Sequence, residues 1–161
     1  MGQKKKYFNN VSKIICTSKW MYNSAKKSYL FKDKLLTEIP LILDNEVWNP
    51  FDKKSSRIFF GIDPESKVVL YGADNFLKNK RKGFEIFKKT INRISKNFDE
   101  KIQLILFGID EIEIDKIRNE FETIKIHNLG KVSDQSTLRL IYSCSDIVVI
   151  PSLIEAFGLI A

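Results

Sequence analysis

Four short apolar runs, separated by stretches of helical character, dominate the second half of this sequence. In chain order they are "KVVLYGA", "KIQLILFG", "TIKIHNLG" and "DIVVIP", all of them after residue 66. Short apolar runs that alternate with helical stretches are typical of parallel strands joined by crossover helices. The sequence therefore predicts an α/β fold with four strands of one parallel sheet between residues 67 and 150.

The last run and the helical stretches make this prediction more specific. Ile147 to Ile150 is bounded by Asp146 and Pro151, which indicates a short strand buried on both faces. A weaker helix is expected over residues 113–121, and another near residue 133, capped by Ser133 or Asp134. The clearest helix follows the first run, where spacings of three and four predict one apolar stripe. Its members are Phe84, Phe87, Ile91, Ile94 and Phe98.

The first part of the chain has a different rhythm. "SKIICTS" predicts a short strand and "KWMYNSAKKSYLF" a helix, so residues 11–32 are expected to pack as a strand and a helix. "EIPLILDNEVWNPFD" has two prolines and no helical period, which favours a strand that passes into a long connection. We place a domain boundary near residue 45, with domains at residues 1–45 and 46–161.

Composition limits the setting of the protein. With 161 residues, 43% of them hydrophobic, the chain can form one core and part of another. Cys16 and Cys144 are its two cysteines, and no start resembling a signal peptide is seen, which favours a reducing, cytoplasmic setting. Cys144 is expected to be a small buried residue. No apolar run approaches membrane-spanning length.

Positive charge is concentrated at the start of the chain. Residues 1–35 contain nine lysines and one acid, Asp33, whereas the remainder is almost balanced. Attraction to anionic lipid, with peripheral contact at the inner face of the cell membrane, is one interpretation, and an ordinary solvated face is the other. Nucleic acid is not an expected partner, because no aromatic ladder or known motif accompanies the lysines.

Two stretches after predicted strands have residues suited to anion binding. Lys80, Arg81 and Lys82 precede Gly83 where a helix begins, and lysine charge with free helical amides suits a diphosphate. Glu155 follows the last strand beside a predicted helix start, at the edge where open α/β sheets bind ligands. The alternatives are a surface cluster of cations and an acid that merely stabilises a helix end.

Several blocks together resemble a known family. In order they are "ICTSKWM", "IPLILDNEVWNP", "VVLYGADNFLKNKRKGFEIF", "QLILFG" and "IHNLGKVSDQSTLRLIYSCSDIVVIPSLIEAFGLIA". This order resembles the family-4 retaining glycosyltransferases of the GT-B fold, especially those that build bacterial surface polysaccharides. The resemblance implies Rossmann-like domains, with the acceptor bound by the N-terminal domain and a nucleotide-diphosphate sugar by the C-terminal domain.

The resemblance also implies roles for individual residues. Lys82 would contact the diphosphate, with Arg81 as the guanidinium nearest to it, and Gly108 and the loop containing Gly130 would lie near the base. Glu155, the first acid of the family's motif, would be the catalytic-site acid that contacts a donor hydroxyl. Ala156, Phe157, Gly158 and Leu159 would offer backbone groups to the donor. No metal and no cofactor are expected, because no metal-binding carboxylate pair accompanies these motifs and Lys82 can neutralise phosphate directly.

Relative to the family pattern, the chain is expected to be a fragment. Residues 1–45 would be the last strand and helix of the acceptor domain, and the second acid of the motif would stand two positions beyond Ala161. The full-length protein would transfer a hexose to a saccharide or lipid-linked acceptor, and we expect this chain to be inactive by itself. A nucleotide-sugar epimerase or phosphorylase, and a non-enzymatic flavodoxin-like interaction module, remain alternatives.

Overall fold

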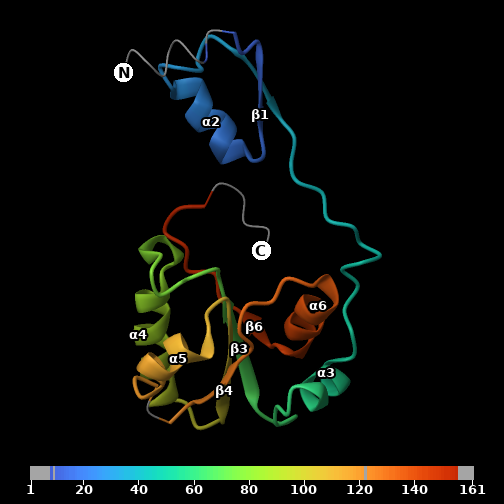
Figure 1. Cartoon of the computed structure of the whole chain (residues 1–161), viewed down its shortest axis with the longest axis vertical. Helices are drawn as coiled ribbons and strands as arrows, with labels where there is room; N and C mark the ends of the chain where they lie inside the picture. The colour runs from blue at the N-terminus through green and yellow to red at the C-terminus, as the bar shows by residue number, and fades with distance from the viewer. Residues whose placement is uncertain (1–7, 9, 122, 156–161) are drawn as a thin grey trace. The chain divides into compact units, whose positions relative to one another are not determined.

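The computed structural model describes residues 8, 10–121 and 123–155 and divides the chain into two compact units (Figure 1). The described residues up to Leu43, together with Glu155, form the N-terminal unit, and Asp44–Ile154 form the C-terminal unit. Within these described ranges, no helix combines the length and apolar composition needed to cross a membrane.

The N-terminal unit is a strand, a helix and a second strand. β1 (Lys13–Cys16) and β2 (Leu35–Glu38) pair in parallel, and α2 (Lys19–Lys27) connects them. The hydroxyl of Ser18 accepts a hydrogen bond from the Met21 N–H at 3.2 Å, which caps the helix where the sequence leaves the strand. The strand and helix predicted between residues 11 and 32 are therefore confirmed.

The strand expected in "EIPLILD" is displaced toward the N-terminus. β2 ends at Glu38, and the Ile39 N–H adds one further bond, to the Cys16 carbonyl, at 2.9 Å. Pro40 has no N–H to donate, so the ladder cannot continue through it. The apolar residues that follow, with Ile42 91% exposed, lie outside any strand.

The C-terminal unit contains a four-stranded sheet in the order β5-β4-β3-β6, and all three pairings are parallel. The strands are β3 (Lys67–Gly72), β4 (Ile102–Phe107), β5 (Lys125–Asn128) and β6 (Ile147–Val148). Each of the four apolar runs thus contains one strand, which confirms the predicted parallel sheet.

Helices cover both faces of this sheet, α4 and α5 one face and α3 and α6 the other (Figure 1). Their bounds are α3 (Lys53–Phe59), α4 (Phe84–Ser95), α5 (Glu111–Arg118) and α6 (Gln135–Cys144). Alternate residues of β3 therefore enter different cores: Val69 and Tyr71 pack under α4, whereas Val68 and Leu70 pack against α6.

The predicted helices are present, with corrections at their ends. Phe84, Phe87 and Ile91 are buried as expected, but Ile94 and Phe98, at the end of the predicted stripe, are each 44% exposed. α5 begins two residues before the predicted start. Asp134, rather than Ser133, caps α6: its carboxylate accepts from the Thr137 N–H at 2.7 Å. Cys144 is fully buried, as predicted.

The prediction for β6 is wrong in one respect. Ile147 is 59% exposed and Val148 37%, so the strand is not buried on both faces. In the described sheet β6 is an edge strand with β3 as its neighbour, whereas β4, between two strands, is buried at every position. The apolar sequence of residues 147–150 is compatible with either position, and only the strand order distinguishes them.

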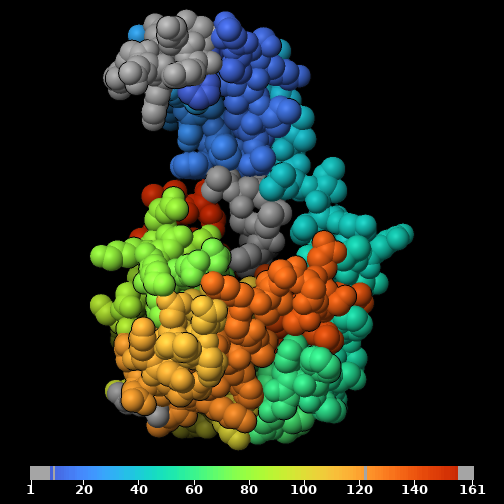
Figure 2. Space-filling model, in the orientation of Figure 1, coloured from blue at the N-terminus to red at the C-terminus, as the bar shows by residue number. Residues whose placement is uncertain are grey.

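One helix, α3, has no counterpart in the sequence prediction, which assigned its residues to no element. It packs beside α6 on the surface of the C-terminal unit (Figure 2). Arg57 of α3 is 5% exposed and donates to the carbonyls of Cys144, at 3.0 Å, and Pro64. It also pairs with Asp146 at 2.7 Å, so one side chain joins α3 to the start of β6.

Candidate functional site

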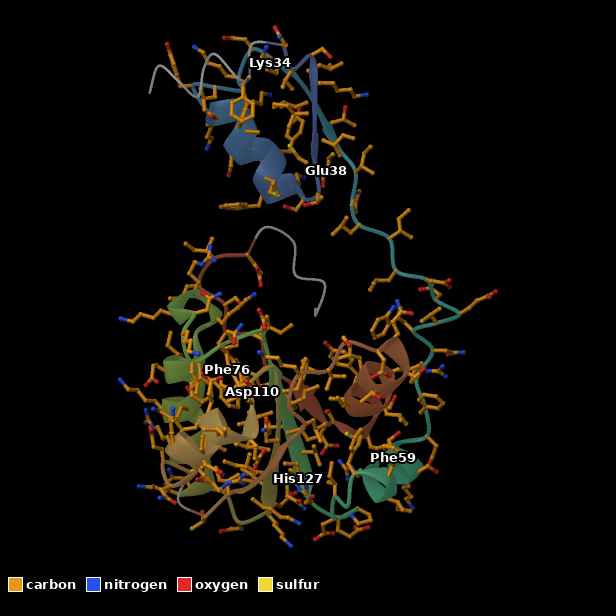
Figure 3. All side chains as sticks on the ribbon, viewed as in Figure 1. Lys34, Glu38, Phe59, Phe76, Asp110 and His127 are labelled. Carbon is orange, nitrogen blue, oxygen red and sulfur yellow. The ribbon has the colours of Figure 1, made fainter. Side chains whose placement is uncertain are left out.

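The carboxyl ends of the four parallel strands meet at one edge of the C-terminal unit, where open α/β sheets bind ligands. The loops that leave this edge contain all the described residues predicted for a site, except Glu155. Figure 3 labels Phe76 and Asp110, which follow β3 and β4; both are displaced toward this edge relative to His127, which lies inside β5.

Gly108 joins three of these loops. Its N–H donates to the Gly130 carbonyl at 2.7 Å, and its own carbonyl accepts from the Asn75 N–H at 2.9 Å. Its φ is +105°, and a Cβ added there would lie 2.1 Å from the Ala73 carbonyl oxygen. Only glycine permits both the backbone conformation and the approach. The structure therefore brings Gly108 and Gly130, two of the predicted site residues, together beside the loop that follows β3.

The same loop continues into a cationic turn, the 3-10 helix η1 (Lys80–Lys82). Gly83 follows with φ +69°, and a Cβ there would lie 2.0 Å from the Pro151 carbonyl oxygen. The Leu153 N–H donates to the Arg81 carbonyl at 2.8 Å. The cationic turn is thus fixed against the segment that follows β6, within the C-terminal unit.

Electrostatics distinguish this turn from its surroundings. Lys78, just before it, pairs with Glu113 of α5 at 2.7 Å; this hydrogen bond raises the pKa of Lys78 and lowers that of Glu113. The residues that follow, Lys80–Lys82, add three formal positive charges in succession at the start of α4. Gly83, the N-cap of α4, has no side chain to accept from the first-turn amides, and such amides attract anions.

Tyr71, near the end of β3, contacts the cationic turn from the buried side of the loop, and the sequence did not single it out. Its side chain is 1% exposed, and its hydroxyl donates to the Lys82 carbonyl at 3.1 Å. Burial raises the pKa of Tyr71 above its usual range, so the hydroxyl keeps its proton. A tyrosine in an otherwise aliphatic buried run was the available signal, because a buried hydroxyl requires a partner.

The predicted catalytic acid is placed less fully. Glu155 is exposed and belongs to the N-terminal unit by its contacts. The predicted backbone groups of Ala156, Phe157, Gly158 and Leu159 lie outside the described residues. Arg81 and Lys82 lie in the loop after β3, and the same loop bonds Gly108, which in turn bonds Gly130. The role of Glu155 stays a prediction.

His127 forms a separate polar cluster inside the sheet. Its Nε2 lies 2.6 Å from Gln103 Oε1, and the Gln103 amide donates to the Ser66 hydroxyl at 2.8 Å. Because the Gln103 oxygen can only accept, Nε2 carries the proton. Burial, with a smaller contribution from the charge of Lys125, lowers the pKa of His127. Across the part of the chain that the structure describes, His, Cys, Asp and Glu side chains form no group of three suited to a metal ion.

Comparisons with known proteins point to one family. Residues 66–161, more than half of the chain, match the family model described as Glycosyl transferases group 1. No curated protein sequence matches the chain.

Two solved structures share the fold. A sucrose-phosphate synthase from Thermosynechococcus elongatus is 21% identical, with a TM-score of 0.77 over 98% of this chain and 39% of that one. WaaG, titled a glycosyltransferase involved in lipopolysaccharide biosynthesis, is 15% identical, with a TM-score of 0.70 over 91% of this chain and 40% of that one. The chain thus spans about two fifths of each, and the predicted Rossmann-like α/β fold is confirmed.

Proposed function

The chain belongs to the glycosyl transferases of group 1, and from this premise we propose that its C-terminal unit binds a nucleotide-diphosphate sugar donor. In the whole protein, the donor's hexose would be transferred, with retention of configuration, to a saccharide or lipid-linked acceptor in surface polysaccharide synthesis. The acceptor would be bound on the N-terminal side.

One observation carries this proposal: the loop after β3 both contacts Gly108 and ends in the cationic turn Lys80–Lys82. A single loop can therefore reach two parts of one ligand. A diphosphate would receive charge from Lys82 and Arg81, together with amides at the start of α4. A nucleoside base could approach the backbone at Gly130, which bonds Gly108 and where an added Cβ would meet open space.

The chemistry proposed for this arrangement needs positioning and charge rather than a nucleophile at the turn. When the sugar leaves, the nucleoside diphosphate gains negative charge, which fixed cations and helical amides stabilise in place. Lys82 would stabilise this negative charge without a metal ion. Glu155 would accept hydrogen bonds from donor hydroxyls, and the backbone of residues 156–159 would contact the donor's oxygens.

Binding of nucleoside diphosphates by calorimetry tests the proposal. Lys82→Ala should weaken binding by about 1.5–3 kcal/mol, the range for hydrogen bonds to charged groups, which is roughly 10- to 150-fold in Kd. Lys78→Ala is the matched control, because Lys78 lies in the same loop but outside the cationic turn, and it is held by Glu113 of α5. If the parent chain binds none of UDP, GDP and ADP, the proposed function is wrong. Equal losses in the two variants would remove Lys82 from the site.

A further inference from the structure

The peptide group between Lys82 and Gly83 is held at both of its ends. Its carbonyl, from Lys82, accepts a hydrogen bond from the Tyr71 hydroxyl at 3.1 Å. Its N–H, from Gly83, donates to the Lys80 carbonyl at 3.2 Å. Because a peptide group is planar, two bonds on opposite sides fix its orientation. That orientation sets the direction in which the three cations leave the backbone and in which α4 begins.

The ring of Tyr71 and its hydroxyl have separable roles. The ring stacks on Phe87 at 4.7 Å between centroids and meets Phe76 edge-on at 5.0 Å. A phenylalanine at position 71 would keep these contacts. The hydroxyl is the polar end of this side chain, and it bonds the backbone of the cationic turn. A hydroxyl buried among apolar side chains destabilises the fold unless it forms a hydrogen bond.

We propose that Tyr71 is a positioning residue whose hydroxyl orients the cationic turn Lys80–Lys82 for the diphosphate of the donor. This inference rests on the proposed function of the C-terminal unit. Tyr71 does not touch the ligand; it acts through the Lys82–Gly83 peptide. The contact between Gly83 and Pro151 limits movement of the turn on its other side, so loss of the hydroxyl releases the peptide rather than the whole loop.

Tyr71→Phe in the full chain tests this role, with Tyr142→Phe as the matched control. Tyr142 is a half-buried tyrosine away from the cationic turn, in α6 and edge-on to Trp48. The probe is whichever of UDP, GDP and ADP the parent binds most tightly, compared with its uncharged nucleoside. Tyr71→Phe should weaken diphosphate binding about five-fold, the change that one neutral hydrogen bond is worth, and leave nucleoside binding unchanged. In a Lys82→Ala background the same substitution should have a smaller effect, because one of the charges that it positions is gone.

The outcomes separate this inference from the proposed function. A parent chain that binds no diphosphate overturns both. A parent that binds, with Tyr71→Phe equal to it, overturns the positioning role alone. Equal losses for diphosphate and nucleoside, an undiminished effect in the Lys82→Ala background, or loss of the cooperative unfolding transition would each assign Tyr71 to fold stability and overturn the positioning role.

Discussion

Replacement of Arg57 by alanine should be the most destabilising single change to the charged residues of the C-terminal unit. Arg57 is 5% exposed, and its guanidinium bonds two carbonyls and the carboxylate of Asp146. Asp146 in turn accepts from the Val68 N–H at 2.7 Å, at the start of the central strand β3. Removal of Arg57 therefore leaves two carbonyls without this donor and the Asp146 carboxylate without one of its cations, at the junction of α3, β3 and β6.

The size of the loss follows from these contacts. Removal of one partner from a buried ion pair costs about 3–5 kcal/mol, because the other charge stays behind. Here Asp146 keeps the Val68 N–H and a second cation, Lys53, at 2.8 Å, and its side chain is 29% exposed. These features place Arg57→Ala near the lower limit, at about 3 kcal/mol. Lys53→Ala, whose side chain is 48% exposed, should cost no more than about 1 kcal/mol.

Urea unfolding followed by tryptophan fluorescence measures the difference. Trp48 contacts Tyr142 of α6 and so reports on the C-terminal unit, whereas Trp20 is 60% exposed in the N-terminal unit. A Trp20→Phe background leaves Trp48 as the single probe. The reasoning fails if Arg57→Ala and Lys53→Ala lower the free energy of unfolding equally, since the burial of Arg57 would then carry no energetic weight.

Two further predictions concern the loop junction and pH. Gly108→Ala should lower the free energy of unfolding by about 3 kcal/mol or more, since its Cβ would meet the Ala73 carbonyl. Gly61→Ala, at φ +62° but in open space, should lower it by about 1 kcal/mol. Thermal unfolding that ranks the two variants equally would contradict the close approach at Gly108. Burial lowers the pKa of His127, so the unfolded chain binds a proton more readily, and stability should fall as the pH drops below the ordinary value of 6.5. Urea midpoints at about pH 7.5 and 5.5 should therefore diverge in the parent and converge in His127→Asn; the same divergence in both would place the effect elsewhere.

The sheet could be predicted because its evidence is local and repeated. Each of the four apolar runs contains its strand. The helix that begins at Phe84 can be predicted from the spacing of its apolar residues alone. Parallel order follows because helical stretches separate the runs. The cap at Asp134 is similarly local, since its partner is three residues away. These features depend on short-range chemistry that any sequence window contains.

Features that depend on strand order could not be predicted in the same way. The sequence of β6 fits a central strand, but its place at the described edge exposes Ile147. α3 was missed because its stabilising contacts, from Arg57 to Cys144 and Asp146, join residues more than eighty positions apart. A cationic residue in a short helix suggests exposure from sequence alone. Only its distant acceptors make burial of that residue possible.

In the candidate site, too, local features could be predicted from the sequence and features that depend on distant residues could not. Charge is a property of residue type, so the cationic turn Lys80–Lys82 was visible in the sequence. Orientation depends on partners elsewhere: Tyr71 lies eleven positions before Lys82, and Pro151 reaches Gly83 from the segment after β6. Position 83 therefore requires glycine for more than its backbone conformation, because a Cβ there would collide with the Pro151 carbonyl and push the two loops apart.

The two ends of β3 bond different parts of the C-terminal unit. Its residues Val68 and Tyr71 belong to opposite faces and opposite ends of one strand. The Val68 N–H bonds Asp146 within the network that stabilises the unit, whereas the Tyr71 hydroxyl bonds the turn that we propose binds the diphosphate. Because the two ends of β3 have separate hydrogen-bond partners, loss of the Arg57–Asp146 pair should lower stability without altering diphosphate affinity in the folded chain. Loss of the Tyr71 hydroxyl should do the reverse, and a binding defect in folded Arg57→Ala would show that the two ends of the strand are coupled.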